Sequence, residues 1–373
     1  MNLAILANSE NRRCQFFLEA AKCLGIRNVV VVPWIDYLSG DIEFSNLDLL
    51  RIESPGENFD VERQFIVRGA ELAAQEPQFS HIDESAARVL ARDLGRIRFQ
   101  RQWQHGWSLT LREIADRIRQ LPNLRVMNPP ADIELMFDKW AAQQHLENHG
   151  VATPERIGLI SSFEDLMSWI GENARVFLKP AHSSSASGVV ALQVRRGRIL
   201  ATTPVEIVRE GGEIRLYNTL RIRRYTDLGD VRDVIDTLSR ERIFAEQWFP
   251  KAGLDGGTFD LRILVVAGQA AHAVARQSQS PITNLHLGNA RGNLDEVKEK
   301  LGESGWREAE AVCESAAAAF PDSHYVAVDL MVSSNFKNFA VAETNAFGDL
   351  LPNLEFNGDD SYTFELRRWL EKL

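Results

Sequence analysis

The stretch YVAVDLMVSSNFKNFAVAETN (residues 325–345) consists of two apolar runs on either side of the polar segment SSNFKN. This pattern predicts a β-hairpin, and a turn centred on Phe336 would place Asp329 directly opposite Glu343. Asn345 would share the face of Glu343, because side chains alternate along a strand. Carboxylates that face each other repel, and a Mg²⁺ ion bound by carboxylate and amide oxygens would relieve that repulsion. A register shifted by one residue would place the two acids on separate faces in water, so the hairpin alone leaves both interpretations open.

A second hairpin is predicted for TFDLRILVVAGQAAHAVARQ (258–277), with its turn at Gly268-Gln269. This arrangement gathers Asp260, Arg262 and Arg276 at one end, and the first two share a face because they are two residues apart. Charged residues within strands as apolar as ILVVA are expected to be functional or paired. An ordinary Asp–Arg surface pair is the alternative.

The stretch VFLKPAHSSSASGVVAL (176–192) could be a serine-rich linker or a loop between two strands. VFLK has the composition of a buried strand that ends at Lys179, and Pro180 cannot donate a further ladder hydrogen bond. GVVALQV then resumes a strand pattern. Strands that bracket the serines so closely favour the loop.

The first ~125 residues alternate strand-like and helix-like segments. The apolar runs NLAILAN (2–8), NVVVVPW (28–34) and LDLLRIES (47–54) predict a small parallel sheet with helices on its faces. The loop NSENRR, which follows the first run, has no glycine, so a nicotinamide cofactor is not expected there.

The remainder of the chain begins with a turn-rich junction, LPNLRVMNPP (121–130). ADIELMFDKWAAQQHLENHG (131–150) has apolar residues at helical spacing and predicts one continuous helix that Gly150 ends. From residue 175 the pattern is mostly strands, with helices expected near 230–241 and 294–319. An amphipathic stripe over 361–373 predicts a C-terminal helix that docks on the protein.

Charge and cysteine content exclude several classes of protein. The net charge of −10 over 373 residues argues against binding to nucleic acid or to an anionic membrane. The basic stretch RIRR (221–224) is interpreted as a solvated strand face rather than a binding site. Cys14 and Cys23 would face opposite sides of one helix, and the chain has no CxxC motif. We find no membrane-length apolar run and no signal peptide at the N-terminus, so we expect a reduced, cytoplasmic location.

Several motifs occur in an order typical of one family. They are Lys139 on a helix, Lys179 before a loop of small residues, and then AEQWF, FDLR, Arg276, TNLH, VDL and ETN. In this order they resemble the ATP-grasp fold from about residue 126 to 355, and most closely the branch of ribosomal-protein glutamate ligases and glutathione synthetases. The resemblance implies a mixed α/β and α+β protein. A Rossmann-like domain (1–126) would precede the N-terminal (127–245) and C-terminal (246–373) subdomains of an ATP-grasp fold.

The resemblance also implies the residues of a nucleotide site between the two subdomains. Lys139 and Lys179 would contact phosphates, Asp260 would accept from the ribose hydroxyls, and backbone groups of Glu246, Gln247 and Trp248 would meet the adenine edge. Other cofactor-binding residues would be His182, Ser183, Ser184, Ser185, Gly188 and Arg262. Arg276, Lys179 and Asn284 would act at the reaction end, and Asp329, Glu343 and Asn345 would bind Mg²⁺. Two Mg²⁺ ions are expected, for which Mn²⁺ could substitute.

The reaction implied is a carboxylate–amine ligation. ATP would phosphorylate a carboxylate, and an amine would then attack the acyl phosphate, with release of ADP and phosphate. The acid could belong to an amino acid, a peptide or a small metabolite. A kinase on the same fold and a non-catalytic ATP-binding scaffold are the alternatives, and the paired lysines with a complete metal set disfavour the scaffold. Neither a nucleic acid nor a membrane is expected as a partner.

The sequence departs from the family in three places. Ile282 and Leu287 stand where the ribosomal-protein ligases have arginines, which puts an acidic substrate in doubt, although Arg291 is near enough to substitute. The metal strand continues as ETNAFGDLLPN instead of ending in Pro-Gly, and a supporting or acceptor-site role for Phe347 and Asp349 is a hypothesis. The phosphate loop has the single glycine Gly188, so we expect its serines to donate from hydroxyls and the loop to order only with ATP.

Three further groups of residues have both a functional and an ordinary interpretation. His182 and His286 are either active-site or solvated loop histidines. The end of the third apolar run could contact the acceptor substrate or form an ordinary turn, through Glu53, Ser54 and Glu57. The aromatic stretch QWQHGW could line a pocket or belong to the core, through Trp103, His105 and Trp107.

Overall fold

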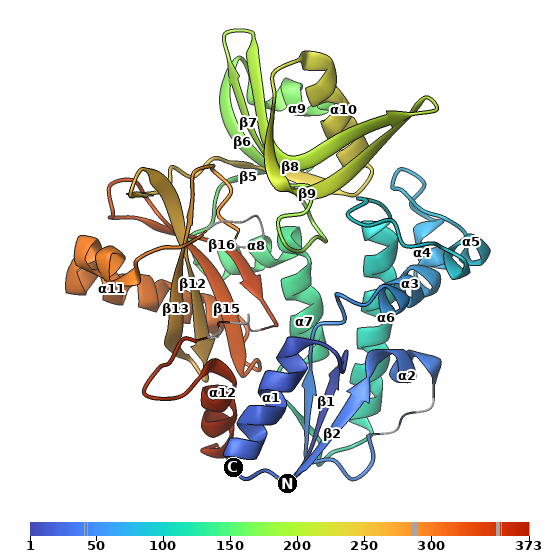
Figure 1. The fold of residues 1–373 in the computed structure, drawn as a ribbon, viewed down its shortest axis with the longest axis vertical. Helices are drawn as coiled ribbons and strands as arrows, with labels where there is room; N and C mark the ends of the chain where they lie inside the picture. Colours follow the sequence, from blue (N-terminus) through green and yellow to red (C-terminus); the bar gives the residue numbers. More distant parts are fainter. Residues whose placement is uncertain (41, 43, 285–289, 348–350, 352, 373) are drawn as a thin grey trace.

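The computed structural model describes the chain except for residues 41, 43, 285–289, 348–350, 352 and 373, and it divides the strands among three sheets (Figure 1). The first sheet is parallel throughout, with the order β2-β1-β3-β4. Its strands are β1 (Asn2–Ala7), β2 (Asn28–Pro33), β3 (Leu49–Ile52) and β4 (Arg125–Val126). Its helices are α1 (Arg12–Cys23), α2 (Trp34–Ser39), α3 (Phe59–Arg68), α4 (Ala70–Ala73), α5 (Glu84–Arg88) and α6 (Gln100–Arg119). The parallel sheet predicted from the apolar runs is confirmed.

Helices α3 and α6 pack unusually closely. A Cβ atom on Gly106 would lie 1.9 Å from the carbonyl oxygen of Phe65, and one on Gly69 would lie 1.9 Å from that of Gln102. Only glycine permits backbones to approach to this distance. The aromatic stretch QWQHGW (102–107) lies in this part of α6. Its Trp107 is fully buried against Trp34 and Phe65. Trp103 packs on the same rings, so the core interpretation is confirmed for both tryptophans, whereas His105 contacts Glu76.

We expect Gly106→Ala to lower the free energy of unfolding by about 1–3 kcal/mol or more, because the added methyl group meets backbone that cannot move aside. The gain in helix propensity, up to about 1 kcal/mol, is too small to offset the clash. The matched control is Gly305→Ala on a partly exposed helix face, which should be neutral or slightly stabilising. Urea denaturation of both variants measures the difference. A Gly106→Ala protein as stable as the control would contradict this account of α3–α6 packing.

The segment 131–150 forms two helices, α7 (Pro130–Phe137) and α8 (Lys139–Asn148), and the prediction of one continuous helix is wrong. Asp138 separates them with extended backbone (φ −88°, ψ 96°), and its side chain caps α8 by accepting from the backbone N–H of Ala141. A carboxylate that caps a helix start satisfies one of the N–H groups left unpaired there. Lys139 is therefore the first residue of α8.

The second sheet has the order β5-β10-β6-β7-β8-β9, antiparallel throughout, with two helices on one face. Its elements are β5 (Arg156–Ile160), α9 (Phe163–Ile170), β6 (Asn173–Pro180), β7 (Val190–Arg195), β8 (Arg198–Glu210), β9 (Glu213–Tyr225), α10 (Leu228–Ser239) and β10 (Ile243–Gln247). β10 runs across the subdomain boundary expected at 245/246, and the domain division stays a prediction.

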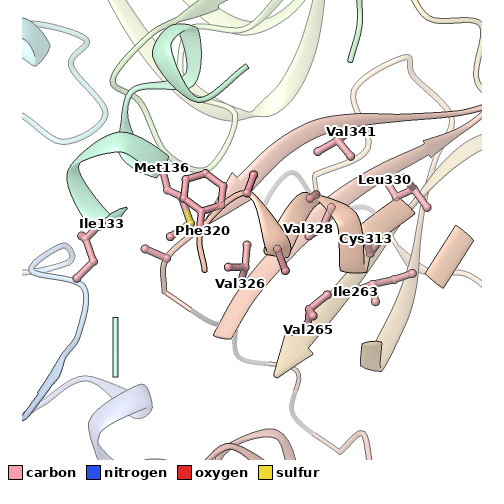
Figure 2. Packing of buried hydrophobic residues seen from close by; sticks show 14 of the residues in the cluster. Ile133, Met136, Ile263, Val265, Cys313, Phe320, Val326, Val328, Leu330 and Val341 are labelled. Carbon is pink, nitrogen blue, oxygen red and sulfur yellow. The ribbon is translucent and has the colours of Figure 1, made fainter. Parts of the chain in front are cut away.

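The third sheet has the order β14-β13-β12-β15-β16, with β11 paired to β12. Its elements are β11 (Gly253–Leu254), β12 (Gly257–Val266), β13 (Gln269–Ser278), β14 (Ala290–Arg291), α11 (Leu294–Ala318), β15 (Tyr325–Val332) and β16 (Phe339–Asn345), followed by α12 (Ser361–Leu370). Figure 2 shows Ile133 and Met136 of α7 packed beside Phe320 and apolar residues of this sheet. α7 thus anchors the third sheet to the chain that precedes it.

Both hairpins of the third sheet form, with corrections to their turns. The turn between β12 and β13 is Ala267-Gly268, one residue earlier than predicted, and both residues have positive φ as a tight hairpin turn requires. In the β15–β16 hairpin Asp329 lies opposite Glu343, which confirms the predicted pair. Nearer the turn, however, Leu330 pairs with Val341, one residue away from the predicted register. Ala342 is the extra residue of a β-bulge, a feature common next to active sites.

The C-terminal helix α12 docks on the protein, as predicted, and it packs against α1, beside which it lies in Figure 1. Tyr362 contacts the rings of Phe16 and Phe17 on α1. Cys14 is buried and Cys23 is exposed, so the two cysteines of α1 face different surroundings, and both thiols are free. Within the described part of the chain, we find no helix with the length and apolar character needed to span a membrane.

Candidate active site

A pocket lies between the second and third sheets and contains about 740 Å³ of empty space, part of it open to solvent. Elements from both sheets contribute to its wall, because β6 and β10 end on one side and β12, β13, β15 and β16 lie on the other. Ten of the residues expected at the site line it: Lys139, Lys179, Ser183, Ser185, Glu246, Asp260, Arg276, Asn284, Asp329 and Glu343. The structure therefore brings most of the expected residues together from distant parts of the chain.

Lys179 is held by a buried carboxylate. Its Nζ lies 2.6 Å from Oε1 of Glu246, whose other oxygen accepts from Nε2 of Gln143 at 2.7 Å. Burial lowers the pKa of Lys179, but the negative charges of Glu246, Glu343 and Asp329 outweigh burial and leave this pKa above its usual value. The lysine is thus positively charged at neutral pH and fixed in direction at the end of β6.

Lys139 approaches the pocket from the start of α8. Its ammonium group donates to the carbonyl oxygen of Ser183 and lies 3.9 Å from Oε1 of Glu343 on β16. This lysine therefore links the loop between β6 and β7 (residues 181–189, the serine loop) to the third sheet. Lys139 and Lys179, the two lysines expected to contact phosphates, line one pocket although they are forty residues apart in the chain.

Asp260 on β12 lies at the centre of a buried charge network. Its Oδ1 accepts from Nε of Arg276 at 2.7 Å, and its Oδ2 contacts Nζ of Lys251 at 3.2 Å and accepts from the hydroxyl of Thr283. Both oxygens of Asp260 are thus already engaged by protein groups. The prediction that they accept from ribose hydroxyls stays a prediction, and it requires these contacts to be shared.

Lys251 belongs to the site although the sequence does not predict it there. It lines the pocket, contacts Asp260, and lies 2.7 Å from the hydroxyl of Thr283. Burial lowers its pKa below the usual value, partly offset by Asp260. It follows the motif EQWFP, and a lysine between a proline and an alanine has no pattern that separates it from a surface lysine.

Asp329 on β15 pairs with two arginines. Arg262 donates to its Oδ1, and an amino group of Arg276 lies 3.0 Å from its Oδ2. Burial raises the pKa of Asp329, but the two guanidinium groups outweigh burial and hold this pKa below its usual range. The carboxylate is therefore ionised, as a metal ligand must be.

The residues expected to bind Mg²⁺ fit a hard cation by their chemistry, provided that Asp329 shares its two oxygens with Arg262 and Arg276. Asp329 and Glu343 face each other across β15 and β16 and both line the pocket. The Nδ2 atom of Asn345 is buried without a partner among the described residues, so no hydrogen bond at this atom fixes the orientation of the amide. Two carboxylates and an amide supply oxygen ligands. In the described chain, no group of three or more His, Cys, Asp or Glu residues could hold a metal ion, so the set depends on the amide.

Several expected site residues, Asn345 among them, are not part of the described pocket lining. His182 is buried against Asp138, and burial lowers its pKa to about 4 despite that carboxylate. Gly188 has positive φ, and a Cβ there would lie 2.7 Å from Pro180. The backbone N–H groups of Gln247 and Trp248 donate to Glu155 and Arg175, so they already have partners. Ser184 is exposed, and Arg262 contacts Asp329.

One side of the pocket is apolar. Phe177, Val189 and Ile282 line it and pack in one cluster, and the ring of Trp248 lies 4.7 Å from that of Phe177. Ile282 therefore belongs to an apolar surface in this protein. With isoleucine at position 282 instead of arginine, this side of the pocket is apolar rather than basic.

The remaining candidates lie elsewhere. His286, Leu287 and Asp349 lie outside the described residues. Arg291 is exposed on β14 opposite Arg276, and Phe347 packs near Trp107. Glu53 is buried against Arg51, and Glu57 accepts from Asn11. The described lining of the pocket includes none of Glu53, Ser54 and Glu57.

Comparisons with known proteins show a family and a shared fold. The model of the YheC/D-like ATP-grasp family matches residues 129–335. Among solved structures, D-cycloserine synthetase DcsG is 15% identical with a TM-score of 0.55, covering 100% of this chain and 99% of its own. The ATP-grasp ligase PsnB, complexed with minimal precursor, Mg and ADP, is 14% identical with a TM-score of 0.52, covering 99% and 97%.

A third structure is the macrocyclase MdnC bound with precursor peptide MdnA from Microcystis aeruginosa MRC. It is 12% identical with a TM-score of 0.54, and the alignment covers 100% of both chains. At these identities the three structures show a shared fold. A sequence comparison with curated proteins finds no match.

Proposed function

Because this chain belongs to the YheC/D-like ATP-grasp family, we propose that it is an ATP-dependent carboxylate–amine ligase that works through an acyl phosphate. The observation that carries the proposal is the pocket in which Asp329 and Glu343 face Lys139 and Lys179. Phosphoryl transfer requires positioned cations and metal ligands rather than a nucleophilic side chain, and the pocket supplies both kinds of group.

The charge of the pocket supports the use of divalent cations. Its described lining has four cationic side chains and four carboxylates: Lys139, Lys179, Lys251 and Arg276, and Glu246, Asp260, Asp329 and Glu343. Among the described lining residues, a triphosphate would therefore meet no surplus positive charge. Mg²⁺, two ions in our proposal and replaceable by Mn²⁺, would supply the missing charge at Asp329, Glu343 and Asn345.

The protein's own groups would act mainly by orientation. Lys139, Lys179 and the serine loop would hold the phosphates, and Phe177, Val189 and Ile282 would contact the base. Arg276 and Asn284 would face the reaction end. An oxygen of the substrate carboxylate would attack the γ-phosphorus as the bond to ADP breaks, and an amine would then displace phosphate from the acyl carbon.

The substrates are proposed only by class. The similar structures carry the names D-cycloserine synthetase and, for PsnB and MdnC, precursor peptides, which supports an amino acid or peptide as one substrate. We place the protein in the cytoplasm because its three cysteines are free thiols, two of them buried.

The proposal is tested by supplying the protein with ATP, Mg²⁺ and pools of amino acids, short peptides and small acids. Release of ADP and phosphate that requires both an acid and an amine supports the ligase. A stable phosphorylated product would support a kinase, and nucleotide binding without turnover in any pool would support a scaffold. Lys179→Ala should abolish turnover, whereas the exposed Lys337→Ala should retain it.

A further inference from the structure

Asp138 occupies the junction between α7 and α8, and its two carboxylate oxygens have different partners. Oδ1 accepts from the backbone N–H of Ala141 at 3.0 Å and caps α8. Oδ2 accepts from a guanidinium N–H of Arg242 at 2.7 Å and lies 3.1 Å from Nε2 of His182. One side chain therefore joins the start of α8, the serine loop and the residue that precedes β10.

Backbone hydrogen bonds reinforce the same junction. The N–H of Lys139 donates to the carbonyl of Ala181 at 3.0 Å, and the N–H of Ala181 donates to the carbonyl of Arg242 at 2.9 Å. The three segments are thus tied at one point. The side chain of Lys139 then extends into the pocket and donates to the carbonyl of Ser183.

The described pocket lining includes Lys139 and Ser183 but not Asp138, His182 or Arg242. We propose that Asp138 is a positioning residue, which holds Lys139 and the serine loop together in the arrangement that receives the phosphates of a nucleotide. This inference rests on the proposed function, because it requires ATP to bind in this pocket. It assigns the Asp138–His182–Arg242 cluster a role that acts through Lys139.

The charges of the cluster indicate which substitution tests it. Burial raises the pKa of Asp138, but hydrogen bonds and charges from His182 and Arg242 outweigh burial and hold this pKa well below its usual range. His182 is neutral at pH 7, since its pKa is about 4. Asp138→Asn keeps an oxygen that can cap α8, but removes the charge that Arg242 faces.

The experiment measures the dissociation constants of adenosine, ADP and ATP, with Mg²⁺, for wild type and Asp138→Asn. We expect ATP to bind about tenfold or more weakly to the variant, ADP to lose less, and adenosine to bind within about twofold of wild type. The matched control is Asp227→Asn, which alters the cap of α10 away from the pocket and should leave all three constants unchanged.

Equal weakening of adenosine and ATP, or unchanged ATP binding, would overturn the positioning role. If Asp138→Asn does not fold, Arg242→Lys tests the same contact, because it keeps the charge but loses the guanidinium geometry. For Arg242→Lys we likewise expect ATP to lose more affinity than ADP, and adenosine to bind about as tightly as to wild type. If the wild-type protein binds no nucleotide, the proposed function fails as well. If wild type binds ATP but Asp138→Asn does not change that binding, only the positioning role fails.

Discussion

Replacing Glu343 by glutamine is expected to reduce turnover by about 10²–10³-fold while the protein stays folded. Glu343 faces Asp329 across the hairpin and lies 3.9 Å from Lys139. The substitution removes a ligand charge from the proposed Mg²⁺ site, and it also removes repulsion between two carboxylates. This relief opposes the lost attraction to Lys139 and Lys179, so the thermal midpoint should stay close to that of wild type.

Steady-state turnover and thermal denaturation of the same preparations check this expectation. Glu343 is preferred to Asp329, because Asp329 also pairs with Arg262 and Arg276 and its loss would disturb the network. Glu308→Gln, on an exposed face of α11, is the matched control and should keep full activity. Wild-type turnover in Glu343→Gln would show that Glu343 is not a metal ligand.

Replacing Arg51 by methionine is expected to lower the free energy of unfolding by about 3–5 kcal/mol. Arg51 is fully buried and lies 2.5 Å from Oε2 of Glu365 on α12 and 3.2 Å from Oε2 of Glu53. Its guanidinium carbon also lies 4.5 Å and 5.1 Å from the ring centroids of Tyr325 and Tyr362. Loss of the cation would leave two buried carboxylates without their partner.

Urea denaturation measures the free energy of unfolding of Arg51→Met and of the control Arg198→Met, in which the replaced arginine is exposed. Adding Glu365→Gln to Arg51→Met should recover part of the loss, because a neutral amide replaces an acid that must otherwise bury an unpaired charge or take up a proton. Burial raises the pKa of Glu365 to about 7 although Arg51 opposes that rise. A change below about 1 kcal/mol in Arg51→Met would show that the cluster does not stabilise the docking of α12.

That residues 325–345 form a hairpin could be predicted, because two apolar runs flank a polar segment. The bulge at Ala342 could not, since nothing in FAVAETN separates a bulged alanine from a paired one. The predicted register fails near the turn and holds at the two acids because the bulge offsets the error in the turn position.

Other features depend on contacts between distant segments. The break at Asp138 interrupts a pattern with good helical spacing, and its partners Arg242 and His182 come from elsewhere in the chain. Lys251 enters the pocket only because Asp260 and Thr283 lie beside it. Local patterns predict elements and alternation, whereas such junctions are determined by tertiary contacts.

The central claim is that a carboxylate becomes an acyl phosphate before an amine attacks it. With the acid from the pool assay labelled with ¹⁸O in its carboxylate, the oxygen that attacks the γ-phosphorus leaves with the phosphate. Mass spectrometry of the released phosphate is therefore the most direct test. The account predicts a single ¹⁸O atom in that phosphate, and phosphate without label during amide formation would contradict it.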